Sequence, residues 1–251
     1  MWTSLAIALG FVLVAFLVAA LPAAWMRRRH GDEHEGETRD LARDITNRLG
    51  VLHGVILGLV FGHVVTQAGD LRAGQRTEAA AVEHVYFLAG EYRAPAVQAA
   101  AARYIDAVID QDWPAQEATG EVSAAGWVAV RALQASTLAL APASRREHVL
   151  AQEIENNLWV IERERQVRGY ESAMHVPFEF WFAAIAGLAL IGGLMFIYPT
   201  SRKHVMIVGA YAIYSGLVLY MIYDLSRPFA GLVRVEPDAF EQARGAIRSG
   251  I

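Results

Sequence analysis

Residues 49–69 read LGVLHGVILGLVFGHVVTQAG, an uncharged run bounded by Arg48 and Asp70. A helix needs about 20 apolar residues to cross a bilayer core about 30 Å thick, so this run is long enough to span a membrane. Three more uncharged stretches meet or approach that length, over residues 2–26, 180–201 and 205–223. The sequence therefore predicts an all-α fold, in which a polytopic membrane protein crosses the bilayer with four transmembrane helices.

The first uncharged stretch has an alternative interpretation as a secretory signal peptide, because small residues around Ala19 and Ala23 would support cleavage. No positive residue precedes the stretch, and arginines follow it directly from Arg27. We therefore expect a retained span.

The overall composition narrows the class of protein and its chemistry. Of 251 residues, 55% are hydrophobic and 19% are charged, whereas soluble domains carry about 25% charged residues. The chain has no cysteine, which excludes disulfides, iron–sulfur clusters and thiol nucleophiles. The net charge of −4 gives no general attraction to nucleic acid. The motifs G-x-x-x-x-G-K-[ST], G-x-G-x-x-G and G-x-S-x-G are absent, so we expect neither an enzyme nor a cofactor.

The region between the second and third spans shows helical patterning and almost no strand signal. Apolar positions three and four residues apart predict helices over residues 70–92, 94–112 and 144–170. Residues 111–126 are expected to form a loop, and residues 122–142, interrupted by Arg131, a soluble helix rather than a fifth span. The predicted parts of the chain are residues 1–69 with spans one and two, a helical bundle at 70–175, a transmembrane hairpin at 176–223 and a docking tail at 224–251.

One group of histidines and acids has residue types that could bind a metal ion. The group comprises His30, Asp32, Glu33, His34, Glu35 and Glu37. His30 and His34 have helical spacing, but Gly31 and Gly36 disfavour a stable helix there. A solvated loop is the preferred interpretation, and no metal site is expected.

The second span carries two different faces. Glycines four residues apart predict a ridge on which another helix packs closely, formed by Gly50, Gly54, Gly58 and Gly62. A second stripe lies about 160° away and comprises His53, Ile56, Val60, His63 and Gln67. Histidines flanking an apolar belt are typical of a pore-lining helix, if several copies surround an axis. The alternative is that both histidines lie near the membrane interfaces and are hydrogen-bonded to neighbours.

The end of the chain carries a motif. Residues 223–240 read YDLSRPFAGLVRVEPDAF, which resembles the D-x-x-R-P-F-x-G-x-[IVL]-x-[VI]-x-P-x-x-F signature of the bestrophin-like family of bacterial membrane proteins. The matching positions are Asp224, Arg227, Pro228, Phe229, Gly231 and Pro237. From the residues themselves, Pro228 is expected to end span four, and the motif to dock the tail on the bundle.

More distantly, the order of parts is similar to that of true bestrophins, which are homopentameric anion channels. That resemblance implies four spans per subunit, a helical domain between spans two and three, and a pore lined by span two. The chain lacks the run of aspartates that forms a calcium clasp, so calcium gating is not implied. True bestrophins keep the helical domain in the cytoplasm, whereas the charges near the span ends slightly favour the opposite side. Orientation therefore stays open.

Two functions remain in competition. The leading hypothesis is a homo-oligomeric, most simply pentameric, channel for small anions in a bacterial inner membrane, with the lipid bilayer and further copies of the chain as its partners. The alternative is a non-conducting membrane scaffold or sensor whose helical bundle binds a protein, because residues 144–170 carry a face rich in arginine and glutamate.

Overall fold

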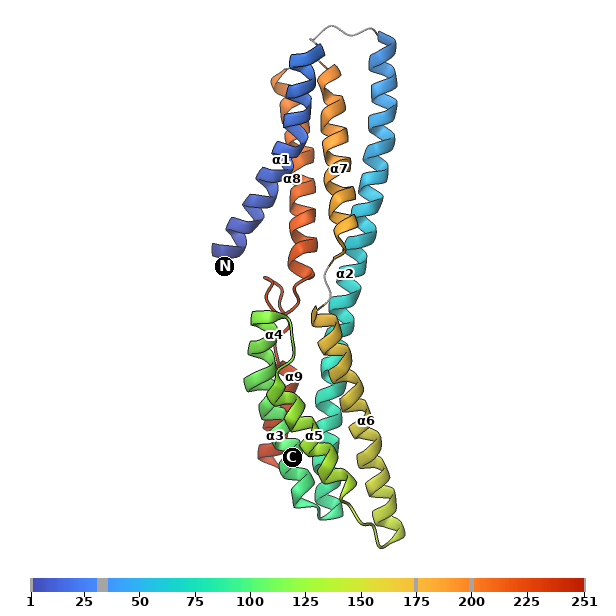
Figure 1. Ribbon diagram of the computed structural model, residues 1–251, viewed down its shortest axis with the longest axis vertical. Helices are drawn as coiled ribbons and strands as arrows, with labels where there is room; N and C mark the ends of the chain where they lie inside the picture. Colours follow the sequence, from blue (N-terminus) through green and yellow to red (C-terminus); the bar gives the residue numbers. More distant parts are fainter. Residues whose placement is uncertain (1, 31–35, 174–175, 199–200, 251) are drawn as a thin grey trace. The chain divides into compact units, whose positions relative to one another are not determined.

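Helices form nearly all of the computed structural model, which describes residues 2–30, 36–173, 176–198 and 201–250 (Figure 1). The elements in chain order are α1 (Trp2–His30), α2 (Gly36–Tyr92), α3 (Pro95–Ala107), the π-helical turn η1 (Val108–Asp112), α4 (Trp113–Thr119), α5 (Ala124–Leu138), α6 (Arg145–Ala173), α7 (Phe178–Leu194), the 3₁₀ turn η2 (Met195–Ile197), α8 (Arg202–Leu225) and α9 (Asp238–Ser249). No strand occurs within these described ranges. The all-α prediction is confirmed.

The chain divides into two compact units. Met1–Val65 and His175–Ser226 form the first, here called the span unit, and Thr66–Met174 and Arg227–Ile251 form the second, the bundle unit. The long helix α2 contributes residues to both.

Four helices are long and apolar enough to cross a membrane, as the sequence predicts. The candidate spans are Trp2–His30, Gly36–Tyr92, Phe178–Ile197 and Val205–Leu225. Helix α5 is not among the candidate spans of the described residues.

Close approaches between small residues hold the span unit together. A Cβ atom added to Gly192 of α7 would lie 2.3 Å from the carbonyl oxygen of Ala19 in α1, and one on Gly216 of α8 would lie 2.8 Å from Cα of Val12. Glycine is needed at both positions because the backbones themselves meet there. Helix α2 joins these helices through Leu57, which belongs to one buried apolar cluster with residues of α7 and α8.

Aromatic packing fixes the C-terminal tail within the bundle unit. The ring of Trp113 meets those of Phe229 and Phe240 edge to face, with centroids 5.4 and 5.8 Å apart. Its indole Nε1 donates a hydrogen bond of 3.2 Å to the carbonyl oxygen of Val235. The chain after α8 therefore contributes five buried side chains to the main core of this unit, those of Phe229, Val235, Phe240, Ala243 and Ile247.

The prediction of a loop over residues 111–126 is wrong, because helix α4 lies inside that range. Pro114 occupies the first turn of α4, where its missing N–H needs no partner. Gly120 ends the helix in the left-handed conformation, with φ of 74°. The hydroxyl of Ser123 then accepts a hydrogen bond from Gly126 N and begins α5. Helix α4 continues directly from the π-helical turn η1, and Gly120 ends this helical segment.

Candidate functional site

Within the span unit, part of the predicted pore-lining stripe faces the chain's own helices. His53 is only 3% exposed, and Ile56 and Val60 pack against the cluster around Leu57. A Cβ atom on Gly187 of α7 would lie 2.6 Å from Nδ1 of His53. The burial of these residues weighs against their facing an axis between copies.

The other two predicted pore residues lie differently. His63 is exposed, and Gln67 is half-buried. The stripe predicted from helical spacing is therefore not presented as one surface by a single chain.

The glycine ridge points away from the other helices of the span unit. A Cβ atom added to Gly50, Gly54, Gly58 or Gly62 would meet nothing within 4 Å, and the last three are exposed. Among the described residues, no atom therefore lies where the side chains of these glycines would begin. The role of the ridge in packing stays a prediction.

A different stripe of α2 lies beside the glycine ridge on the same outward surface. Val55 is 52% exposed, Leu59 is 70% exposed, and His63 follows at the same spacing of four residues. We call these three residues the outward stripe. The spacing could be read from the sequence, but only the packing of α7 and α8 shows which face of α2 they leave open.

His53 is a polar side chain buried inside the span unit. Its Nε2 atom is buried and has no hydrogen-bond partner among the described residues. The nearest aromatic ring is that of Tyr211 in α8, with the two ring centroids 6.2 Å apart. Ionisable residues at membrane depth usually face a bundle interior, and His53 does so here.

A second candidate cluster lies in the bundle unit and consists of buried charges. Arg165 and Arg168 of α6, Glu78 of α2 and Asp112 of η1 are each at most 2% exposed. Arg168 donates to both carboxylate oxygens of Glu78 at 3.0 Å, and Arg165 donates to both oxygens of Asp112, one at 3.2 Å. Arg168 also reaches Asp112 at 3.3 Å. We call these four residues the buried charge network.

Neighbouring side chains complete this network. The hydroxyl of Tyr104 donates to Glu78 at 2.5 Å, and the backbone N and hydroxyl of Ser123 donate to Asp112 at 2.9 and 2.6 Å. The guanidinium of Arg168 lies 5.3 Å from the ring centroid of Trp113. A π turn holds one residue more than an α turn, so η1 changes the face on which Asp112 lies and helps to bring it to α6.

The surroundings of the network favour the charged form of Asp112 and the neutral form of Tyr104. Burial alone would raise the pKa of Asp112, but the hydrogen bond from Arg165 and the charges of both arginines outweigh burial and hold that pKa below its usual value. Burial raises the pKa of Tyr104 well above its ordinary value, and the charge of Glu78 adds to the effect. Two cations face two anions, so the network is neutral as a whole.

Sequence reasoning missed this network, although a signal was present. The apolar stripe of α6 runs through Ile154, Leu158 and Ile161 at alternating spacings of four and three. Arg165 and Arg168 continue the same alternation, which places them on the buried face. Two arginines in a buried register require carboxylates opposite them.

The described residues contain no group of three histidine, aspartate or glutamate side chains arranged to hold a metal ion. Most of the histidine and acid group around His34 lies in residues 31–35, outside the described ranges.

The motif at the end of the chain forms the passage from α8 into the tail. Asp224 lies in the last turn of α8 and accepts a hydrogen bond of 3.4 Å from the hydroxyl of Tyr220. After Pro228 the chain turns, as Gly231 N donates to Arg227 O at 2.8 Å and Val235 N to Pro228 O at 2.7 Å. Pro237 directly precedes α9.

Comparison with curated proteins and with solved structures found no match. The family model described as the bestrophin-like domain matches residues 10–240, which is most of the chain. With its four apolar helices and its RPF-x-G passage after the last of them, this chain belongs to the bestrophin-like family of membrane proteins.

Proposed function

We propose that the protein is a homo-oligomeric channel of a bacterial inner membrane that passes small anions, with α2 lining the path. The observation that carries the proposal is the outward surface of α2, which the chain's own spans leave open over the glycine ridge and the outward stripe. The distant similarity of the family to bestrophins supports a pentamer and an anion as the permeant species.

The two parts of this surface have complementary roles in a ring. Glycines allow the backbones of neighbouring spans to approach closely, so the ridge is suited to contact the adjacent copy. Val55 and Leu59 would then form an apolar constriction of the kind that gates by dewetting, with His63 as a polar residue one turn further on. One chain has no axis of its own, so several copies are required.

The face of α2 that lines the path in this proposal differs from the face predicted from the sequence. Ile56 and Val60 follow Val55 and Leu59 by one residue, which corresponds to about 100° around the helix. His63 belongs to both sets. The proposal uses the outward stripe because His53, Ile56 and Val60 are already packed within the chain.

The mass of the detergent-solubilised protein, measured by native mass spectrometry, is the first test. A ring of five copies is expected. A monomer or dimer would exclude a pore between copies and would overturn the channel.

Cysteine accessibility tests which face of α2 meets water, and the absence of native cysteine leaves no background. Single cysteines at Val55 and Leu59 are expected to react with a charged thiol reagent and to lose anion flux into proteoliposomes. The matched controls are cysteines at Ile56 and Val60, which are expected to react slowly. Faster reaction at positions 56 and 60 than at positions 55 and 59 would instead support the pore-lining stripe predicted from the sequence.

A scaffold or sensor remains the second candidate, and one feature of α6 favours it. Trp159 is 66% exposed and lies at a surface hollow of about 410 Å³, with Glu162 and Arg163 beside it. If this hollow holds a protein partner, Trp159→Ala abolishes stoichiometric recovery of that partner from native membranes, whereas Val149→Ala on the same helix does not. Purification of the homo-oligomer alone would count against the scaffold.

A further inference from the structure

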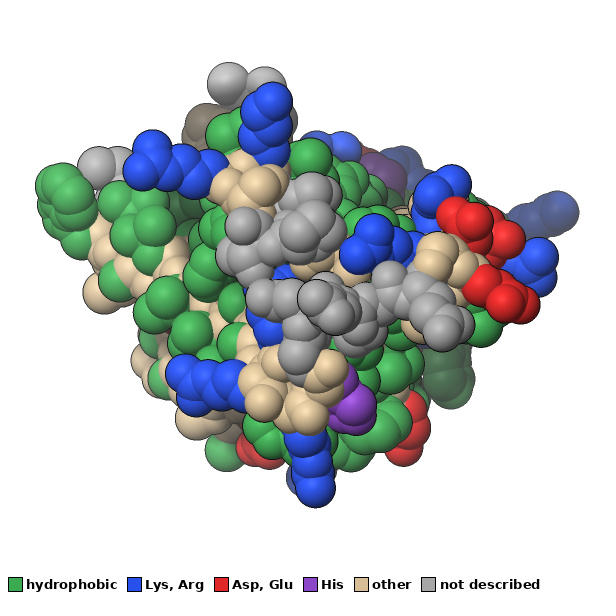
Figure 2. All heavy atoms as spheres, turned by 90° about the horizontal axis from the view of Figure 1, so that it is seen from above, with side chains coloured by type: hydrophobic (Ala, Val, Ile, Leu, Met, Phe, Trp, Pro, Cys, Tyr) green, Lys and Arg blue, Asp and Glu red, His purple; other side chains and the backbone are tan. Residues whose placement is uncertain are grey.

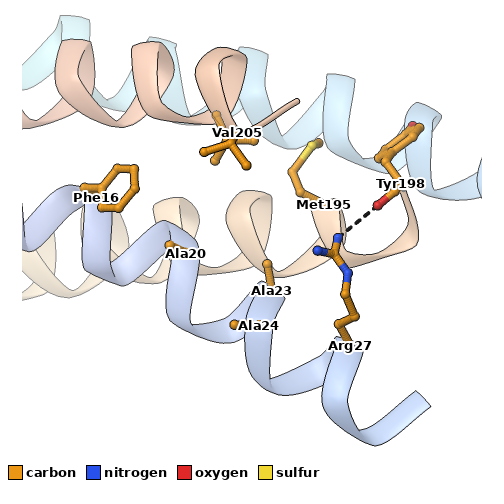
Figure 3. Close-up of a pocket in the computed structure, with 9 residues that line it drawn as sticks. Phe16, Ala20, Ala23, Ala24, Arg27, Met195, Tyr198 and Val205 are labelled. Carbon is orange, nitrogen blue, oxygen red and sulfur yellow. Dashed lines mark hydrogen bonds between the residues drawn. The ribbon is translucent and has the colours of Figure 1, made fainter. Parts of the chain in front are cut away.

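A cavity of about 140 Å³ lies in the span unit between α1, η2 and α8 (Figure 3). Apolar side chains form most of its wall, among them Phe16, Ala20, Ala24 and Val205. Arg27 is the charged residue of the lining, at one end of the cavity. A dry apolar cavity of about 150 Å³ accommodates a group the size of benzene, so this one takes several carbon atoms of a hydrocarbon chain.

The cavity is open to its surroundings on one side. Val205 is 51% exposed although it lines the cavity, and Ala24 is exposed as well. Because α1 and α8 are membrane spans, the surroundings at this depth are lipid.

The dimensions of the lining match one leaflet of a bilayer. Phe16 and Arg27 are separated by eleven residues, or about 16 Å of helix, which is roughly half of a bilayer core about 30 Å thick. Trp25 is 58% exposed beside them, and exposed tryptophan is typical of the membrane interface. Arg27 therefore lies near the level of the lipid headgroups, and Phe16 near the middle of the bilayer.

Positive side chains surround the headgroup end of the cavity. Nη2 of Arg27 donates to the carbonyl oxygens of Tyr198 at 2.9 Å and Phe196 at 3.4 Å, which holds the guanidinium at the mouth. Arg28 follows Ala24 by one turn and Arg202 precedes Val205 by one turn, and both arginines are exposed. Figure 2, seen from above, shows lysine and arginine side chains spread over several sides of this view, with acidic side chains mainly at the right and a few along the lower edge.

We propose that this cavity binds one anionic glycerophospholipid, of the phosphatidylglycerol type. One acyl chain packs between α1 and α8 along Ala20, Ala24 and Val205, and the phosphate lies at Arg27. Arginine forms strong charge-assisted hydrogen bonds to phosphate, and each basic residue near an anionic headgroup contributes about 1 kcal/mol. A zwitterionic lipid fills the same cavity but gains less from the arginines. The site does not depend on conduction.

The test is native mass spectrometry of the delipidated full chain, titrated with dioleoylphosphatidylglycerol or dioleoylphosphatidylcholine. The wild type is expected to retain one phosphatidylglycerol per chain and to bind phosphatidylcholine more weakly. Ala24→Phe, which fills the cavity from its open side, is expected to abolish retention. Ala6→Phe is the matched control, because Ala6 is exposed on the same helix and lies outside the cavity.

The charge is tested separately from the cavity. Arg27→Gln is expected to weaken phosphatidylglycerol binding about five-fold, the equivalent of about 1 kcal/mol. Arg43→Gln is the control, since Arg43 lies on α2 and pairs with Asp40. Should Arg27→Gln disturb the fold, as judged by circular dichroism, Arg28→Gln and Arg202→Gln alter only exposed side chains and are expected to weaken binding similarly.

Three results would overturn the proposal. They are equal binding of the two lipids by the wild type, unchanged retention by Ala24→Phe, and a photo-crosslinker at position 205 that captures a second copy of the chain instead of lipid. The last result would assign the cavity to an interface between copies.

Discussion

Asp112 is the residue on which the buried charge network depends most, since it pairs with both Arg165 and Arg168. Asp112→Ala leaves a buried guanidinium without its carboxylate, and breaking a buried pair in this way costs about 3–5 kcal/mol. We expect a fall in the unfolding temperature of roughly 10 °C. Asp106→Ala is the control, because Asp106 is 47% exposed and pairs only at 3.7–3.8 Å. Equal shifts for the two variants would show that the network contributes little.

Acid should weaken the same interaction. The pKa of Asp112 is lower in the folded chain than in the unfolded chain, so folding favours its charged form. The contribution is complete above the unfolded value of about 3.9 and is lost as the pH falls through the lower, folded pKa. Unfolding temperatures of the wild type and Asp112→Asn, measured between pH 7 and pH 2, should therefore differ by a constant amount above about pH 4 and approach each other below it. A difference that stays constant over the whole range would contradict this assignment.

Gly126 allows the network to form, because a Cβ atom there would lie 2.3 Å from Oδ1 of Asp112 and 2.4 Å from Nη2 of Arg165. Gly126→Ala is expected to destabilise the chain by about 1–3 kcal/mol, since neither neighbour is free to move. Gly245→Ala in α9 meets nothing within 4 Å and should be neutral or slightly stabilising, because alanine favours helix. The two unfolding temperatures, measured side by side, check the contrast. Similar values would indicate that the network shifts easily.

At the scale of elements, most helices could be predicted from local sequence. The four spans follow from apolar runs, and α6 from its apolar spacing. The prediction of a loop around α4 is wrong because Pro114 lies directly after a π-helical turn within one helical segment, which ends only at Gly120. The face that α2 presents to its neighbours could not be predicted, since His53 and His63 have equal polarity in the sequence and only the position of Gly187 decides which is covered.

The glycine ridge of α2 makes a prediction for that helix as an element. A Cβ atom added to Gly58 meets nothing within 4 Å among the described residues, and Gly58 itself is exposed, so the fold of the monomer should tolerate Gly58→Leu. If the ridge packs on a neighbouring copy, the added side chain separates the helices and the oligomer dissociates. Gly10→Leu on α1 is the matched control, because Gly10 also has open space around it. Mass photometry of both variants decides, and an intact oligomer with Gly58→Leu would remove the ridge from the interface.

For the whole molecule, the candidate channel illustrates what one chain does not specify. Val55 and Leu59 of the outward stripe are ordinary apolar side chains in the sequence, and their exposure gains a meaning only if several copies surround them. Family membership indicates the kind of protein, whereas the surface left open by α7 and α8 indicates where copies would meet. The family match and the open surface of α2 therefore give separate information, the first about the kind of protein and the second about the surface available for contact.

If the proposed channel forms, His63 gives it a property that can be measured in vesicles. Histidine changes its charge between about pH 5 and 8, and a ring of copies multiplies that charge around one axis. If His63 faces the axis, acidification places positive charge in the path, and chloride flux relative to sodium flux should rise as the pH falls from 8 to 5. His63→Gln should flatten this dependence, whereas His53→Gln should leave it in place because His53 is 3% exposed. A pH dependence that survives His63→Gln and disappears with His53→Gln would instead support the orientation of α2 predicted from its sequence, in which His53 faces the axis.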